Sequence, residues 1–257
     1  MAFSLMILLC QAGLAITGEA QESWPRALSP GHGRKSFNME VNNLVGAKDK
    51  VILQVLPGEQ KDLDELGGET RPTKICIANK QATSCYIAHA RTNFARDPQA
   101  SLIEIGGGQS AVLFEARYVG INDEWKSVAV LGLSSRGKLI NLLPAVAVSM
   151  QDQFRLWHDA EIADGELITV ANYVWKLRPP EEETHFSFHH YQISTYAFCP
   201  GSGRYLLVDR FTTRKKFAGL DDEDHPGNRV LNTMMLHVKT RMFRHREAGK
   251  SPCPSGN

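Results

Sequence analysis

Between residues 50 and 220 the chain alternates short apolar runs with turn-favouring segments, and this alternation limits the fold more than any other feature. Runs rich in β-branched and aromatic residues occupy residues 51–56, 111–119 and 205–211, each shorter than a typical helix. Residues 134–137 and 200–203, which read Ser-Ser-Arg-Gly and Pro-Gly-Ser-Gly, have the composition of hairpin turns. The pattern predicts an all-β fold built from antiparallel meanders.

The order of the runs indicates an internal repeat. Residues 111–143 contain three strand-like runs joined by a polar loop and a turn, and residues 167–211 show the same succession. The first run of each unit ends in Tyr-Val, at Tyr118 and at Tyr173. Residues 51–88 form a poorer third copy. Such units predict either propeller blades or unrelated meanders within one β-sandwich.

An acidic segment lies ahead of the second unit and carries Asp159, Glu161 and Asp164. It resembles the FG-GAP/VCBS type of propeller repeat, which places a calcium loop before such a strand, so the resemblance implies calcium ligation by these carboxylates. Calcium takes about six to eight oxygen ligands, and Ala163 at the next alternate position departs from the family pattern. The stretch from residue 157 to residue 217 is also similar to uncharacterised exported bacterial proteins, which implies no activity.

Residues 1–20 have the pattern of a secretory signal peptide. Residues 3–16 are mostly apolar but fall short of the roughly 20 residues that a membrane-spanning helix needs. Gly18 and Ala20 put small residues at the −3 and −1 positions of a cleavage site. The alternative is a buried N-terminal strand or helix, because no Lys or Arg precedes the apolar run. The pattern predicts an exported protein, periplasmic or secreted, in which residues 21–49 form an irregular lead-in.

Removal of this leader would remove Cys10 and leave four cysteines, an even number that permits disulfides in an exported chain. Three pairings are open. Cys76 and Cys85 lie in short apolar runs that flank a polar segment, so the favoured pairing joins them across a hairpin. Cys199 and Cys253 would then tie the C-terminal tail to the rest of the chain. The alternatives are free buried thiols or a metal site, although the absence of a Cys-x-x-Cys argues against zinc.

Residues 221–257 change in character from β-rich to charged. An acidic run at residues 221–224 precedes residues 228–247, where apolar residues recur at helical spacing, and residues 248–257 form a tail. The apolar stripe comprises Leu231, Met234, Met235, Val238 and Met242. Several Lys and Arg residues make this helix basic. It either packs its stripe on a sheet with the bases in water or lies on an anionic membrane surface.

Residues 185–191 hold the densest group of candidate binding side chains. If they continue a strand, His185, His189 and Tyr191 share one face, while Phe188 on the other face points to the core. Histidines four positions apart on a strand are separated by about 13 Å, too far to share a metal ion. Another histidine precedes the acidic loop, beside a carboxylate. The candidate ligand-binding residues are His158, His185, His189 and Tyr191.

The sequence contains no catalytic motif: it lacks a Gly-x-Ser-x-Gly elbow and a Gly-rich phosphate loop followed by Lys. A net charge of +1 gives no overall field that would attract nucleic acid. We therefore expect a non-catalytic exported binding or scaffold module that holds a protein or glycan, without a cofactor unless the acidic loop binds calcium. The alternatives are an exported hydrolase built from these histidines with acids of other strands, and a peripheral envelope protein that docks through its basic helix.

Overall fold

The computed structural model describes residues 36–58, 72–78, 84–88, 95–119, 124–144, 146–149, 152–175, 184, 187–217, 229–249 and 253. The predicted signal peptide, the acidic run at residues 221–224 and the candidate residue His185 lie outside the described residues. Within the described ranges the chain forms β-strands, followed near its C-terminal end by a helix.

The strands form three antiparallel sheets, and each is a meander of strands that follow one another in the sequence. The first sheet contains β1 (Phe37–Val41), β2 (Val51–Leu56), β3 (Lys74–Ile77) and β4 (Cys85–Ile87). The second contains β5 (Ala95–Gly106), β6 (Gln109–Val119), β7 (Glu124–Leu133) and β8 (Leu139–Asn141), with β9 (Val146–Ser149) paired to β7. The third contains β10 (Gln153–Trp157), β11 (Leu167–Val174), β12 (His190–Cys199) and β13 (Arg204–Thr212), and α1 (Arg229–Glu247) follows. The prediction of all-β meanders with a C-terminal helix is confirmed.

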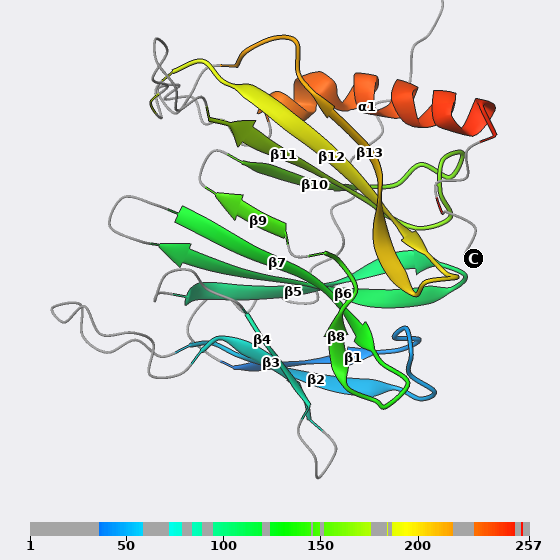
Figure 1. Ribbon diagram of the computed structural model, residues 1–257. Coiled ribbons are helices and arrows are strands. Elements are labelled where there is room, and N and C mark those ends of the chain that lie inside the picture. Colours follow the sequence, from blue (N-terminus) through cyan, green and yellow to red (C-terminus); the bar gives the residue numbers. More distant parts are fainter. Residues whose placement is uncertain are drawn as a thin grey trace, which may run out of the picture.

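The three sheets are stacked face to face, and α1 lies across the outer face of the third sheet (Figure 1). Each interface has its own hydrophobic cluster. Leu53 of the first sheet and Phe114 of the second share one cluster. Val130 of the second sheet and Ile168 of the third share the next. The third cluster joins the outer face of the third sheet to α1.

Strand β6 shows why some strand segments are apolar at every position instead of alternating apolar and polar residues. Val112 and Phe114 belong to the cluster shared with the first sheet, whereas Ala111 and Leu113 belong to the cluster shared with the third. Alternate side chains of a strand point to opposite faces. Because both faces of the middle sheet are covered, both sets are apolar and the usual alternation of apolar and polar residues disappears.

The repeat units predicted from the sequence correspond to the second, third and fourth strands of each sheet. The first strand of each sheet was not included in the predicted unit. Strand β1 lies within residues 21–49, which were expected to be irregular, and its pairing with β2 corrects that expectation. Only Met39 and Val41 of this five-residue strand are buried, alternating with exposed Asn38 and Glu40. Together with Phe37, these two residues give the strict apolar–polar alternation of a half-buried strand, so a local signal was present in the sequence.

The predicted helix is confirmed, and its apolar stripe packs on the third sheet. Leu231, Met235, Val238 and Met242 are buried there, and Met234 packs beside them. The amide nitrogen of Leu231 donates to Oε1 of Gln153 in β10 at 2.9 Å, which satisfies one of the helix N–H groups that lack a partner within the helix. The stripe is therefore not available to a membrane in this structure.

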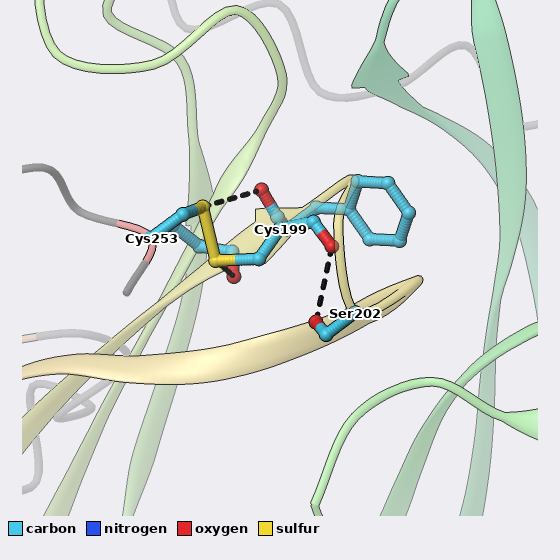
Figure 2. Close-up of a disulfide and its surroundings, with 5 residues drawn as sticks. Cys199, Ser202 and Cys253 are labelled. Atoms are coloured by element: carbon cyan, nitrogen blue, oxygen red, sulfur yellow. Dashed lines mark hydrogen bonds between the residues drawn. A yellow bond between two sulfur atoms is a disulfide. The ribbon is translucent and has the colours of Figure 1, made fainter. Parts of the chain in front are cut away.

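Both predicted disulfides are present. Cys76 and Cys85 face each other across β3 and β4, with their Cα atoms 4.0 Å apart. Cys199 ends β12 and bonds Cys253, which lies beyond α1, with a Cα–Cα distance of 5.3 Å (Figure 2). The alternatives of free thiols or a cysteine metal site are therefore wrong. Two disulfides indicate that the chain folds in an oxidising compartment.

Candidate functional site

A cluster of aromatic rings lies where β11 ends and β12 begins. Tyr173 and Tyr191 are directly paired across these strands, and an isolated bridge pairs His189 with Phe217. The ring centre of Tyr173 lies 4.9 Å from that of Trp175 and 5.3 Å from that of His189. The rings of Tyr191 and Phe217 are 6.0 Å apart at an angle of 88°. We call these five side chains the aromatic cluster.

His189 is fully buried at the centre of the aromatic cluster. Its Nε2 lies 2.8 Å from the carbonyl oxygen of Thr184, an acceptor, so Nε2 carries the proton and donates. Its backbone nitrogen donates to the carbonyl oxygen of Phe217, and the nitrogen of Phe217 donates back to the carbonyl oxygen of His189. Both the side chain and the backbone of His189 are therefore hydrogen-bonded within the fold.

Tyr191 is also buried, and its hydroxyl stays protonated at neutral pH. Burial, followed by the electrostatic effects of Asp152 and Tyr173, raises the pKa of Tyr191 to about 12. A phenol with so high a pKa does not serve as a base near neutral pH. Tyr191 therefore contributes its ring to the aromatic cluster.

Other aromatic residues in or next to the cluster are more exposed than His189 and Tyr191. Phe188 is 61% exposed, an unusual state for a phenylalanine beside buried rings. Tyr173 and Trp175 are half-buried. Nζ of Lys215, an exposed residue, lies 5.6 Å from the ring centre of Phe217. Exposed and half-buried aromatic residues in this region, with a cation nearby, suit binding by packing and stacking.

The expectation that Phe188 points to the core was wrong: Phe188 is exposed, whereas His189 next to it is buried. That expectation treated residues 185–191 as one strand, whereas β12 begins at His190. Ser187 and Phe188 precede the strand, and the amide nitrogen of Thr184 donates to Oγ of Ser187 at 2.8 Å. The alternation of a strand therefore does not determine where Phe188 points.

The structure does not bring His158 and His189 together. His158 is exposed and follows the end of β10 that pairs with Leu167, whereas His189 precedes the end of β12 that pairs with Val174. Strand β11, eight residues long, lies between these ends, and the rise of a strand separates them by about 23 Å. A single site cannot use both imidazoles.

The acidic loop folds back on the protein. Oδ1 of Asp159 accepts from the amide nitrogen of Glu161 at 3.2 Å, and its Oδ2 lies 3.6 Å from Nζ of Lys239. Oδ2 of Asp164 accepts from the amide nitrogen of Gly107 at 2.7 Å. In the part of the chain that the structure describes, no three His, Cys, Asp or Glu residues are placed to hold a metal ion. The carboxylates of Asp159, Glu161 and Asp164 are thus not gathered into such a group.

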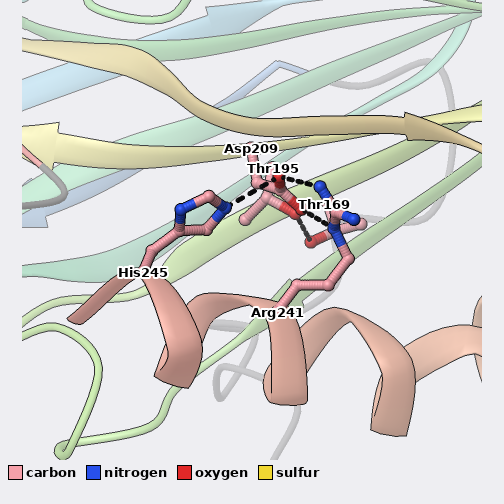
Figure 3. A network of polar contacts seen from close by, with 5 residues as sticks. All are labelled: Thr169, Thr195, Asp209, Arg241 and His245. Atoms are coloured by element: carbon pink, nitrogen blue, oxygen red, sulfur yellow. Dashed lines mark hydrogen bonds and ion pairs between the residues drawn. The ribbon is translucent and has the colours of Figure 1, made fainter. Parts of the chain in front are cut away.

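A cluster of polar side chains between α1 and the third sheet was not predicted from the sequence (Figure 3). We call it the polar cluster. Arg241 donates from Nε and Nη2 to the two carboxylate oxygens of Asp209, at 2.7 and 2.8 Å. Nε2 of His245 lies 3.2 Å from Oδ1 of the same carboxylate. Arg241 and His245 are four residues apart and so lie on one side of the helix. The only sequence signal was Asp209 itself, a lone acid within an otherwise mostly apolar strand.

Burial alone would raise the pKa of Asp209, but the hydrogen bonds and positive charges of Arg241 and His245 outweigh it and hold the pKa below its usual value. The ring of Phe211 lies beneath the Arg241 guanidinium, 4.7 Å from its carbon. This cluster fixes the helix on the sheet.

The fold and its two disulfides define a class: an all-β protein of stacked meanders, closed by a C-terminal helix and suited to an oxidising compartment. No helix within the described ranges has the length and apolar character needed to cross a membrane. Comparisons with protein-family models, with curated proteins and with solved structures found no match.

Proposed function

We propose that this chain is an exported, non-catalytic binding module that holds a protein or a glycan through the aromatic cluster and Phe188. The leader-like residues 1–20 and the two disulfides support export. Three stacked sheets give a rigid support, and ligands commonly bind to loops at the ends of such a support.

The observation that carries the proposal is the exposure of Phe188 directly before His189, a member of the aromatic cluster. Phe188 is 61% exposed, while His189 next to it is fully buried. Aromatic residues dominate the binding energy of protein interfaces, and tyrosine and tryptophan rings present flat surfaces for stacking. Binding by packing and stacking needs no catalytic group, and Lys215 adds a cation near the ring of Phe217.

The test places a photo-reactive phenylalanine analogue at position 188 of the full chain in the cells that produce it. The control places the same analogue at position 207, because Leu207 is also exposed, at 42%, but lies on β13. A discrete cross-linked protein at position 188 alone supports a protein ligand. A glycan array probed with the oxidised protein covers the other ligand class.

On that array, Phe188→Ser should weaken binding about tenfold or more, whereas Leu207→Ser should leave it unchanged. The proposal is wrong if position 188 gives no specific cross-link and no glycan responds to Phe188→Ser. It is also wrong if both serine variants weaken binding equally, because the effect would then come from general loss of stability.

A further inference from the structure

Helix α1 carries a charge that the rest of the chain does not share. Its 19 residues contain five Lys or Arg and one Glu, a net charge of +4. The whole chain has a net charge of +1, so the remaining residues sum to −3. The helix is thus a basic element at the outside of the stack, on a protein whose other residues are close to neutral overall (Figure 1).

Part of this charge is used within the fold. Arg241 pairs with Asp209, and Lys239 lies near Asp159. The exposed charged or apolar side chains of the helix are Arg229, Leu236, His237, Arg244, Arg246 and Glu247. We call these six the outer face of α1. They present more positive than negative charge to the solvent.

Leu236 distinguishes the outer face from an ordinary solvated helix surface. It is 77% exposed, the highest value among the exposed large apolar side chains of the described residues. Arg229 lies two turns before it and Arg244 two turns after it, toward the same side of the helix. A soluble polyanion offers nothing to such a side chain, whereas a lipid surface combines negative headgroups with apolar chains just beneath them.

We propose that the outer face of α1 docks on an anionic phospholipid surface. The helix lies on the surface and remains packed on β10–β13, so its buried stripe takes no part. Each Lys or Arg near an anionic bilayer contributes on the order of a few-fold to tenfold in affinity, and the attraction falls with salt. The proposal uses other residues than the aromatic cluster, so either one can hold without the other.

The test is co-sedimentation of the full, oxidised protein with vesicles of phosphatidylcholine, with and without about a third of phosphatidylglycerol. We expect binding to the anionic vesicles only, and release at about 0.5 M salt. Arg244→Gln with Arg246→Gln should weaken binding about thirtyfold, from two lost charges. Phe188→Ser should bind these vesicles as the unmodified protein does.

The matched control is Arg136→Gln with Lys138→Gln, which removes the same charge from an exposed turn between β7 and β8. Binding equal to that of the unmodified protein supports a local site. An equal loss in both double variants overturns the proposal, because net charge alone would then explain the binding. Thermal melting of all variants separates a loss of folding from a loss of binding.

Leu236→Ser decides between a lipid surface and a soluble polyanion. We expect about fivefold to tenfold weaker binding to anionic vesicles, with no change in binding to inorganic polyphosphate. If polyphosphate binds as tightly as the vesicles and Leu236→Ser changes neither, the outer face is a general polyanion site and the lipid proposal is wrong. Equal binding to neutral and anionic vesicles overturns it as well.

Discussion

The inner face of the third sheet packs against the second sheet, and its outer face packs against α1. The two interfaces differ in the polar groups that they contain. The inner face contributes Ile168 and Val170 to an apolar cluster. On the outer face, Oγ1 of Thr169 accepts from Nε1 of Trp157 at 2.9 Å and lies 3.1 Å from Oγ1 of Thr195 (Figure 3). The outer face therefore combines apolar contacts with hydrogen bonds inside the sheet, and Gln153 and Asp209 on this sheet also bond Leu231 and Arg241 of the helix.

The contrast extends to carboxyl groups. Asp209 under the helix is held charged by Arg241 and His245, and its pKa lies below the usual value. Glu166, at the edge of the inner interface, meets no such cation: burial and then the charge of Glu104 raise the pKa of Glu166 to about 7. One sheet thus accommodates a charged carboxylate where the helix supplies cations and disfavours it where the partner is another sheet.

The largest effect is expected from breaking the apolar interface. Ile168 is fully buried between the second and third sheets, and Ile168→Ala should lower the free energy of unfolding by about 4 kcal/mol because it leaves a cavity. Ile168→Val, which keeps most of the volume, should cost about 1 kcal/mol. Urea unfolding of the oxidised protein measures both. Equal losses would mean that the interface is not tightly packed.

The next effect comes from breaking the polar interface. Arg241→Ala leaves the carboxylate of Asp209, whose side chain is 4% exposed, without its main partner, and should cost about 3 kcal/mol at neutral pH. Replacing the pair together, Asp209→Leu with Arg241→Met, should cost about 1 kcal/mol or less, because no buried charge then remains. If the double variant is as unstable as Arg241→Ala, packing and not the unpaired charge explains the loss.

The destabilisation caused by Arg241→Ala should depend on pH. A carboxyl whose pKa is lowered in the folded state contributes stability above its ordinary value of 3.8, and that contribution is lost as the pH falls through the lowered pKa. The difference in unfolding free energy between the unmodified protein and Arg241→Ala should therefore shrink below about pH 4. Ile168→Ala should show no such change, because it removes no titrating group.

Several features of this molecule could be predicted because their information is local in the sequence. The helical spacing from Leu231 to Met242 gave both the helix and its buried side. The two apolar runs around a polar segment gave the bridge between Cys76 and Cys85. The strands with the longest apolar runs were recognised for the same reason, because each is one continuous segment.

Other features depend on contacts between distant residues. The burial of His189 depends on its bridge to Phe217, 28 positions later in the sequence, and nothing near residue 189 indicates it. Asp209 and Arg241 are 32 residues apart, on a strand and a helix whose docking no local pattern specifies. The aromatic cluster and the polar cluster are both of this kind, so sequence analysis named His189 and Tyr191 without their environment and missed Asp209.

The smallest effect expected is on Glu166, and it tests the contrast between the two carboxyl groups directly. Because its pKa is raised from 4.5 to about 7 in the folded state, the folded protein holds this proton between these pH values while the unfolded chain has lost it. The contribution of Glu166 to the free energy of unfolding therefore falls as the pH rises from about 4.5 to 7, and it is constant above pH 7. Glu166→Gln keeps the shape and removes the charge.

This variant should be more stable than the unmodified protein at pH 8 by about 1 kcal/mol, a modest value because the partly exposed group is screened by solvent. Near pH 5 the two proteins should unfold alike. Thermal melts at both pH values measure the difference, with Glu161→Gln as the control for loss of an exposed acid from the same loop. A gain that is independent of pH would mean that Glu166 is not held neutral, and the two interfaces would then treat carboxyl groups alike.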